Sequence, residues 1–203
     1  MENIDAILYI NLEGRGDRKL HILNELSKIC DDSKIHRIDA IRTQNGAIGC
    51  GLSHIKALTY AHEHPEWKSV LIVEDDFTLK SQIDFNSMIQ LLYETTEFDV
   101  GLPSYNHFEL KYMNTSHDNI KKVLYSQTTS SYIIKQSYIP TLIQNMLEAV
   151  QSMQHHGVKH ENSIDIYWNN LVKTGEWYCI FPAIGYQYHN YSDIQHTVTN
   201  YGC

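Results

Sequence analysis

Val70-Leu-Ile-Val73, followed directly by Glu74-Asp-Asp76, is the stretch of the chain that decides the fold. Four consecutive apolar, mostly β-branched residues predict a strand buried on both faces, as in the parallel sheets of α/β proteins. In open α/β sheets, ligands bind at the carboxyl ends of the strands. The three acids therefore stand where a ligand site is expected.

The spacing of these acids favours a metal site. Glu74 and Asp76 are two residues apart, so on an extended segment their side chains can point the same way and share a hard cation such as Mg²⁺ or Mn²⁺. Crowded carboxylates resist ionising together unless a cation compensates them. The alternative is a solvated turn with a helix cap, but the position directly after a buried strand favours the metal site.

The rest of the chain alternates strands with helices. This pattern predicts an α/β fold with a Rossmann-like, mostly parallel sheet covered by helices on both faces, and 203 residues are enough for one such domain. Residues 105–121 are polar and predict a loop, and the tail from Pro182 is expected to be irregular. The expected strands are 6–12, 35–40, 70–73, 98–102, 131–134 and 177–181, and the expected helices are 17–29, 52–62, 85–94, 137–153 and 164–171.

A second cluster is Gly49-Cys-Gly-Leu-Ser-His54. We expect its glycines to form a turn that begins the helix over 52–62, because backbone amides at a helix start suit an anion. Ser53 and His54 would add side-chain donors to a phosphate or ribose. The alternative is a plain turn before a helix.

Charge and composition argue against nucleic acid as a partner and against a membrane span. The net charge is −8, from 16 basic and 24 acidic residues, and there is no basic run, which argues against nucleic acid. A protein this acidic would need a compensating cation to bind a phosphorylated ligand. Because no apolar run approaches the ~20 residues of a membrane span and the acidic start shows no signal peptide, a cytoplasmic protein is expected. Four cysteines without CxxC spacing disfavour a zinc knuckle and predict reduced thiols.

An ordered series of motifs over residues 6–194 resembles glycosyltransferase family 25, which includes bacterial lipooligosaccharide and collagen galactosyltransferases. The series is Asn11-Leu12 with Arg15 and Arg18, Gly49–His54, Val73–Asp76, Ser130–Ile134, Asp165–Trp168, and Pro182 with Gln187 and Ser192-Asp193.

The resemblance implies a GT-A fold and a divalent metal, Mn²⁺ or Mg²⁺. It also implies a nucleotide-sugar donor, with UDP-galactose or UDP-glucose as the expectation, a glycan or glycoprotein acceptor, and inversion at the anomeric carbon. In such a single domain over 1–203, the nucleotide-binding part would cover about 1–104 and the acceptor side about 105–203.

Carried over by position, the resemblance also implies roles for individual residues. Asp76, with Glu74, would contact the metal. Many GT-A enzymes complete the metal shell with a C-terminal histidine, for which His189 is the candidate and His196 the competitor. The donor-binding residues would be Asn11, Leu12, Arg15, Arg18, Ser53, His54, Glu74 and Asp75.

Asp165 is the candidate general base that deprotonates the acceptor hydroxyl. It begins an amphipathic helix, and the flat indole of nearby Trp168 suits a sugar face. Catalysis would then depend on Asp165 together with Asp76, whose metal stabilises the leaving diphosphate as a Lewis acid. Alternatively, Asp165 is a helix N-terminal charge stabilised by the helix dipole.

Two other functions compete with this interpretation. A nucleotidyltransferase also combines a Rossmann-like sheet with carboxylates and a metal, but it would usually show a more basic glycine-rich loop than Gly14-Arg-Gly16. A carbohydrate-binding module could keep the fold without turnover, although a pure binder has little need of the acidic triplet.

Overall fold

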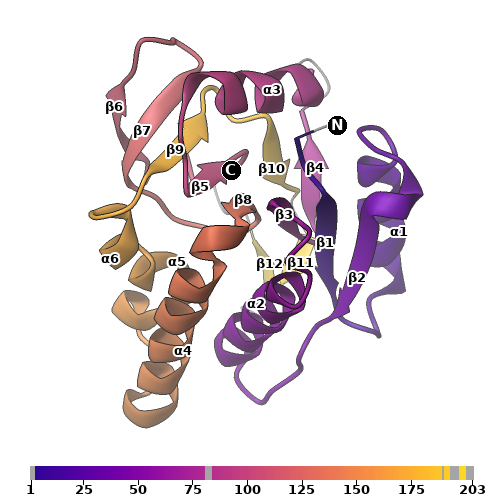
Figure 1. Ribbon diagram of the computed structural model, residues 1–203. Coiled ribbons are helices and arrows are strands. Elements are labelled where there is room, and N and C mark those ends of the chain that lie inside the picture. Colours follow the sequence, from indigo (N-terminus) through magenta and orange to yellow (C-terminus); the bar gives the residue numbers. More distant parts are fainter. Residues whose placement is uncertain (1–2, 81–83, 189, 193–196, 200–203) are drawn as a thin grey trace.

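The computed structural model describes residues 3–80, 84–188, 190–192 and 197–199. In this part of the chain, an eight-stranded sheet has the order β2-β1-β3-β8-β5-β9-β7-β6 (Figure 1). Its strands are β1 (Ala6–Asn11), β2 (Ile35–Asp39), β3 (Ser69–Glu74), β5 (Val100–Leu102), β6 (Lys111–Asn114), β7 (Ile120–Tyr125), β8 (Ser131–Lys135) and β9 (Trp177–Ile180).

The predicted mostly parallel sheet is confirmed. β1 is parallel to both β2 and β3, and β5 is parallel to β9. β8 is antiparallel to both its neighbours, as is β7. It follows that β7 and β8 run opposite to the other six strands.

Helices cover both faces of the sheet (Figure 1), as expected from the strand pattern. Along β1, Leu8 and Ile10 belong to the core on one face, whereas Ile7 and Tyr9 belong to the core on the other, so the whole run is apolar. Buried residues of α2 and α4 complete the first core, and those of α1 and α3 complete the second. These helices are α1 (Gly16–Leu26), α2 (Gly46–His62), α3 (Phe85–Thr95) and α4 (Ile139–His156).

The start of α2 differs from the prediction. The helix begins at Gly46 instead of residue 52, because the side chain of Asn45 accepts hydrogen bonds from the backbone amides of Ala47 and Ile48. The glycines of the 49–54 cluster therefore lie inside the helix and not in a turn before it. A Cβ on Gly49 would lie 2.6 Å from the carbonyl oxygen of Ile41, so glycine permits the close approach of helix and loop.

The segments expected to lack structure contain strands. Residues 105–121 include β6 and the start of β7. All four residues of β6 are exposed, so this strand shows no apolar alternation. The tail after Pro182 also forms short strands, where an irregular segment was expected: β10 (Gly185–Gln187) pairs with β4 (Phe77–Leu79), and β11 (Asn190–Ser192) pairs with β12 (Thr197–Thr199).

The helix expected over 164–171 is two short helices, α5 (Ile164–Tyr167) and α6 (Asn169–Val172), which meet at Trp168. Three short 3₁₀ segments, η1 (Asp32–Lys34), η2 (Gln136–Tyr138) and η3 (His160–Asn162), complete the described chain. Among the described residues, no helix combines the length and apolar character needed to cross a membrane.

Candidate active site

A cavity of about 670 Å³ lies at the carboxyl ends of β1 and β3. Its size is within the range of pockets that hold small molecules and cofactors. Residues of the acidic triplet line it, together with the loop after β1, the loop between β2 and α2, and α5. The sequence-predicted site residues that line it are Leu12, Arg15, Arg18, Ser53, His54, Glu74, Asp75, Asp76 and Asp165.

Arg18 joins two of the three acids. Its Nη1 donates to Oδ1 of Asp75 at 2.9 Å and to Oδ2 of Asp76 at 3.0 Å, and all three side chains are almost fully buried. Asp75 also accepts a hydrogen bond from the side-chain amide of Asn11 at 2.7 Å. Asn11 is buried and does not line the cavity, so in this structure it positions Asp75.

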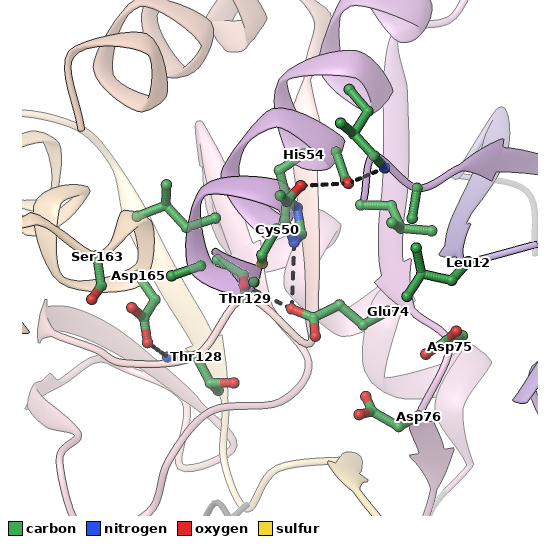
Figure 2. Close-up of a pocket in the computed structure, with 18 of the residues that line it drawn as sticks. Leu12, Cys50, His54, Glu74, Asp75, Asp76, Thr128, Thr129, Ser163 and Asp165 are labelled. Atoms are coloured by element: carbon green, nitrogen blue, oxygen red, sulfur yellow. Dashed lines mark hydrogen bonds and ion pairs between the residues drawn. The ribbon is translucent and has the colours of Figure 1, made fainter. Parts of the chain in front are cut away.

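Glu74 lies between two polar groups from other elements. Its Oε1 accepts a hydrogen bond from the hydroxyl of Thr129 at 2.7 Å and lies 3.4 Å from Nε2 of His54 (Figure 2). Burial alone would raise the pKa of this carboxyl, but the hydrogen bonds from His54 and from the Thr129 hydroxyl bring the pKa below its ordinary value.

Gln187 brings Glu74 and Asp76 to one point. Its Nε2 lies 3.2 Å from Oδ1 of Asp76 and 3.4 Å from Oε2 of Glu74. The pairing of Gln187 with Phe77 in the β10–β4 ladder holds it there. The two carboxylates expected from their spacing to point the same way therefore converge on one polar group.

The charge balance of the triplet is unfavourable without a further cation. Burial first, and then the charge of Glu74, raise the pKa of Asp76 to about 7, and burial also raises the pKa of Asp75. Three ionised carboxylates with the Arg18 guanidinium would leave two negative charges. A divalent cation would compensate these charges, and oxygen ligands are those that Mg²⁺ and Mn²⁺ prefer. The residues present therefore fit such an ion.

Ser53 and His54 are held by the protein itself. The Ser53 hydroxyl donates to the carbonyl of Gly49 at 2.6 Å and accepts from the amide of Ile41 at 2.8 Å. His54 Nδ1 is hydrogen bonded to the hydroxyl of Tyr132 at 3.1 Å, and its Nε2 faces Glu74. Both are buried deep in the cavity wall, and the helix start that lines the cavity is Gly46-Ala47.

Asp165 comes from the first turn of α5 and lies beside Thr128, on the far side of the cavity from Asp75 and Asp76 (Figure 2). Its Oδ2 accepts a hydrogen bond from the Thr128 backbone amide at 3.1 Å. Burial, opposed by this bond and reinforced by the charge of Glu74, raises the pKa of Asp165.

The expectation that Trp168 presents its ring to a sugar is wrong. The indole is fully buried, and its Nε1 donates to the carbonyl of Ser126 at 3.2 Å. It packs edge-on against Trp177 and Tyr132 in the core. A large apolar ring next to a cavity gains more from burial than from exposure.

Thr128 has an unusual backbone conformation, with φ at +81°. A β-branched residue in this region is strained and is retained only where its surroundings hold it. Here Asp165 accepts from its amide and Gln187 accepts from its hydroxyl at 2.9 Å. The strained residue thus links the predicted base to the side chain that bridges Glu74 and Asp76.

Several lining residues were missed from the sequence. Arg42 lies shortly after the end of β2, much as the acids lie at the end of β3. The rule that ligands bind at the carboxyl ends of strands would therefore have found it. Thr128 and Thr129 carry no local signal, because tertiary packing brings them to the cavity. Cys50 lies in the 49–54 cluster, four residues before His54, but was given no role there. The predicted metal ligand His189 and its competitor His196 lie outside the described residues.

No protein-family model matches the chain, and no curated protein sequence matches it. Solved structures do match its fold. A197 from STIV aligns over 97% of this chain and 95% of its own, with a TM-score of 0.52 at 14% identity. A glycosyltransferase involved in the glycosylation of the major capsid of PBCV-1 aligns over 87% of this chain and 92% of its own, with a TM-score of 0.52 at 7% identity.

The fold and the cavity together define the class. The chain is a single α/β domain of the GT-A type, with a Rossmann-like sheet and a carboxylate-lined cavity at the carboxyl ends of its strands. At these identities the likeness shows the fold alone. The particular resemblance to family 25 stays a prediction.

Proposed function

We propose that this protein is a glycosyltransferase that binds a nucleotide sugar and a divalent cation in the cavity. It would transfer a hexose, with UDP-galactose or UDP-glucose as the first donors to test, to a hydroxyl of a glycan or glycoprotein. Inversion at the anomeric carbon is part of the proposal and rests on the resemblance to family 25.

One observation carries the proposal: Glu74 and Asp76, at the end of the central strand β3, converge on Gln187 beside a basic residue, Arg18, in a cavity large enough for such a donor. The GT-A-type fold, shared with a glycosyltransferase structure, supports this interpretation of the site.

The cation would be held by Asp76 and Glu74, with His189 as the further predicted ligand. Bound there, it would supply Lewis-acid stabilisation of the charge that develops on the departing diphosphate. Arg15 and Arg18 line the same part of the cavity and would bind phosphate oxygens, for which the guanidinium fork is suited.

Asp165 would hold the acceptor hydroxyl on the opposite side. The acceptor oxygen would attack the anomeric carbon while the bond from that carbon to the phosphate oxygen breaks. The hydroxyl proton would pass to Asp165, and the nucleoside diphosphate would leave with the bonding electron pair. The raised pKa of Asp165 makes its carboxylate a stronger base than an ordinary aspartate.

Calorimetric titration with a panel of nucleotide sugars, in Mn²⁺ and in chelator, tests the proposal. We expect metal-dependent binding of one donor. Asp76→Asn keeps the size of the side chain and should lower the affinity in Mn²⁺ tenfold or more, which corresponds to about 1.4 kcal/mol.

Asp118→Asn is the matched control, because it removes the same charge from an exposed turn distant in sequence from the triplet. It should leave donor binding unchanged. Equal affinity in Asp76→Asn and the wild type would contradict the metal site.

The reaction product distinguishes the alternatives. A glycosyltransferase releases a nucleoside diphosphate from its donor, whereas a nucleotidyltransferase releases pyrophosphate from a nucleoside triphosphate. Glycan binding with neither product would favour the carbohydrate-binding module.

A further inference from the structure

We propose that Cys50, His54 and Glu74 form a second cation site, selective for a softer divalent ion such as Zn²⁺, in the wall of the same cavity. This inference goes beyond the proposed function, which concerns a hard cation at Glu74 and Asp76. Glu74 belongs to both sites, so an ion held at one site would withdraw negative charge from the other.

The three side chains already converge. A sulfur of Cys50, a ring nitrogen of His54 and a carboxylate oxygen of Glu74 all lie within 4.8 Å of one another (Figure 2). Cys50 and His54 are four residues apart on α2, so they occupy the same face of the helix. Glu74 ends β3 and points toward that face.

The distance between His54 and Glu74 suits two ligands of one ion. Their nearest atoms, Nε2 and Oε1, are 3.4 Å apart, which is long for a hydrogen bond to a carboxylate. Zinc bonds of about 2.0–2.1 Å at tetrahedral angles place two such ligand atoms about 3.3 Å apart. Binding would therefore need little movement of either side chain.

Neighbouring groups hold the ligands in orientation. Metal binding would place the hydrogen of His54 on Nδ1, which then donates to the hydroxyl of Tyr132, and the lone pair of Nε2 would take the ion in place of the present contact with Glu74. The hydroxyl of Thr129 fixes the carboxylate of Glu74. Metal-bound histidines and carboxylates commonly have partners of this kind, which orient the ligand and tune its basicity.

The ligand types define the ion. Thiolate and imidazole suit Zn²⁺ better than Mg²⁺ or Mn²⁺, which prefer oxygen. Cys50, His54 and Glu74 all line the cavity, so an ion can reach them from it. Three protein ligands leave a fourth position of a tetrahedral ion for water or a donor atom in the cavity.

The test uses the metal-stripped full chain and Co²⁺ as a spectroscopic probe for Zn²⁺. We expect Co²⁺ to give a sulfur-to-metal charge-transfer band and tetrahedral visible bands, and Zn²⁺ to displace both. Cys50→Ser should abolish the charge-transfer band and weaken Zn²⁺ affinity tenfold or more. Cys30→Ser is the matched control, because Cys30 packs against the core on the other face of the sheet, next to α1, and its thiol donates to the carbonyl of Leu26.

A charge-transfer band that persists in Cys50→Ser, or is absent in the wild type, would overturn the inference. These spectra need no catalytic activity, so they stand apart from any failure of the proposed function. If donor turnover is found, Zn²⁺ should inhibit the Mn²⁺-dependent reaction, and Cys50→Ser should lose that inhibition relative to its own uninhibited rate.

Discussion

The carboxylate of Asp165 is proposed to act as the catalytic base, yet burying its charge lowers the stability of the fold. Burial raises its pKa, so ionisation of Asp165 is less favourable in the folded protein than in the unfolded chain. Asp165→Asn keeps an acceptor for the Thr128 amide and removes the buried charge. We expect the variant to be more stable by about 1 kcal/mol, measured by urea unfolding, and to transfer sugar at least about 100-fold more slowly.

Glu161→Gln on the neighbouring η3 is the control for this change, because it removes an exposed acid. Neither stability nor rate should change in that variant. Unchanged transfer in Asp165→Asn would show that Asp165 is not the base and would favour its alternative role as a charge at a helix start.

The pH dependence of the reaction follows from the same residue. The folded pKa of Asp165 is raised above the ordinary value of 3.8, first by burial and then by the charge of Glu74. A base must be ionised to act, so the transfer rate should fall as pH falls through this raised pKa. The stability contribution has the opposite sign, because ionisation destabilises the fold as pH rises from the unfolded pKa to the folded one.

The measurement is the rate of transfer per mole of enzyme across mildly acidic pH, with unfolding followed at each point. We expect an acid limb with a midpoint above pH 3.8. If the residual activity of Asp165→Asn has the same limb as the wild type, another group sets it.

At the scale of elements, the surroundings of a glycine in α2 and of a glycine in α1 predict different effects of an alanine substitution on stability. A Cβ on Gly49 would lie 2.6 Å from the Ile41 carbonyl oxygen, whereas Gly16 at the start of α1 has no such neighbour within 4 Å. Gly49→Ala should destabilise by about 1–3 kcal/mol through overpacking, despite a helix-propensity gain of up to about 1 kcal/mol. Gly16→Ala should be neutral or stabilising in the same unfolding measurement. Equal effects would mean that the loop carrying Ile41 moves freely.

A helix or strand could be predicted where its own sequence carries the pattern, and was missed where only its contacts with other segments define it. β1 and β3 are buried on both faces, so continuous apolar runs mark them and their ends. The start of α2 was missed because Asn45-Gly46 has the composition of a turn, although Asn45 acts as a helix cap. β6 was missed because all its residues are exposed and only its pairing with β7 makes it a strand.

In the candidate site of the whole molecule, too, a residue could be predicted where its signal is local in the sequence, but not where distant segments place it. The acidic triplet could be found from the sequence because it directly follows its strand. Gln187 and Tyr132 belong to the motif series that resembles family 25, but their roles in the site, like that of Thr128, could not be predicted, because their positions depend on ladders and loops that join distant segments. Gln187 lies 111 residues from Asp76 and 113 from Glu74, and the β10–β4 pairing brings it to them.

Because the cavity walls come from both halves of the chain, donor binding should stabilise the whole domain. A donor present at 100 times its dissociation constant, with Mn²⁺, should add about 2.7 kcal/mol to the free energy of unfolding. For a domain of this size, that corresponds to a rise in Tm of about 5–11 °C. Thermal unfolding with donor plus Mn²⁺, donor plus chelator, and Mn²⁺ alone measures the effect. The full rise is expected only with both present and should be lost in Asp76→Asn. A full rise with donor in chelator would separate donor binding from the metal, and Arg15 and Arg18 would then be the groups that neutralise the diphosphate.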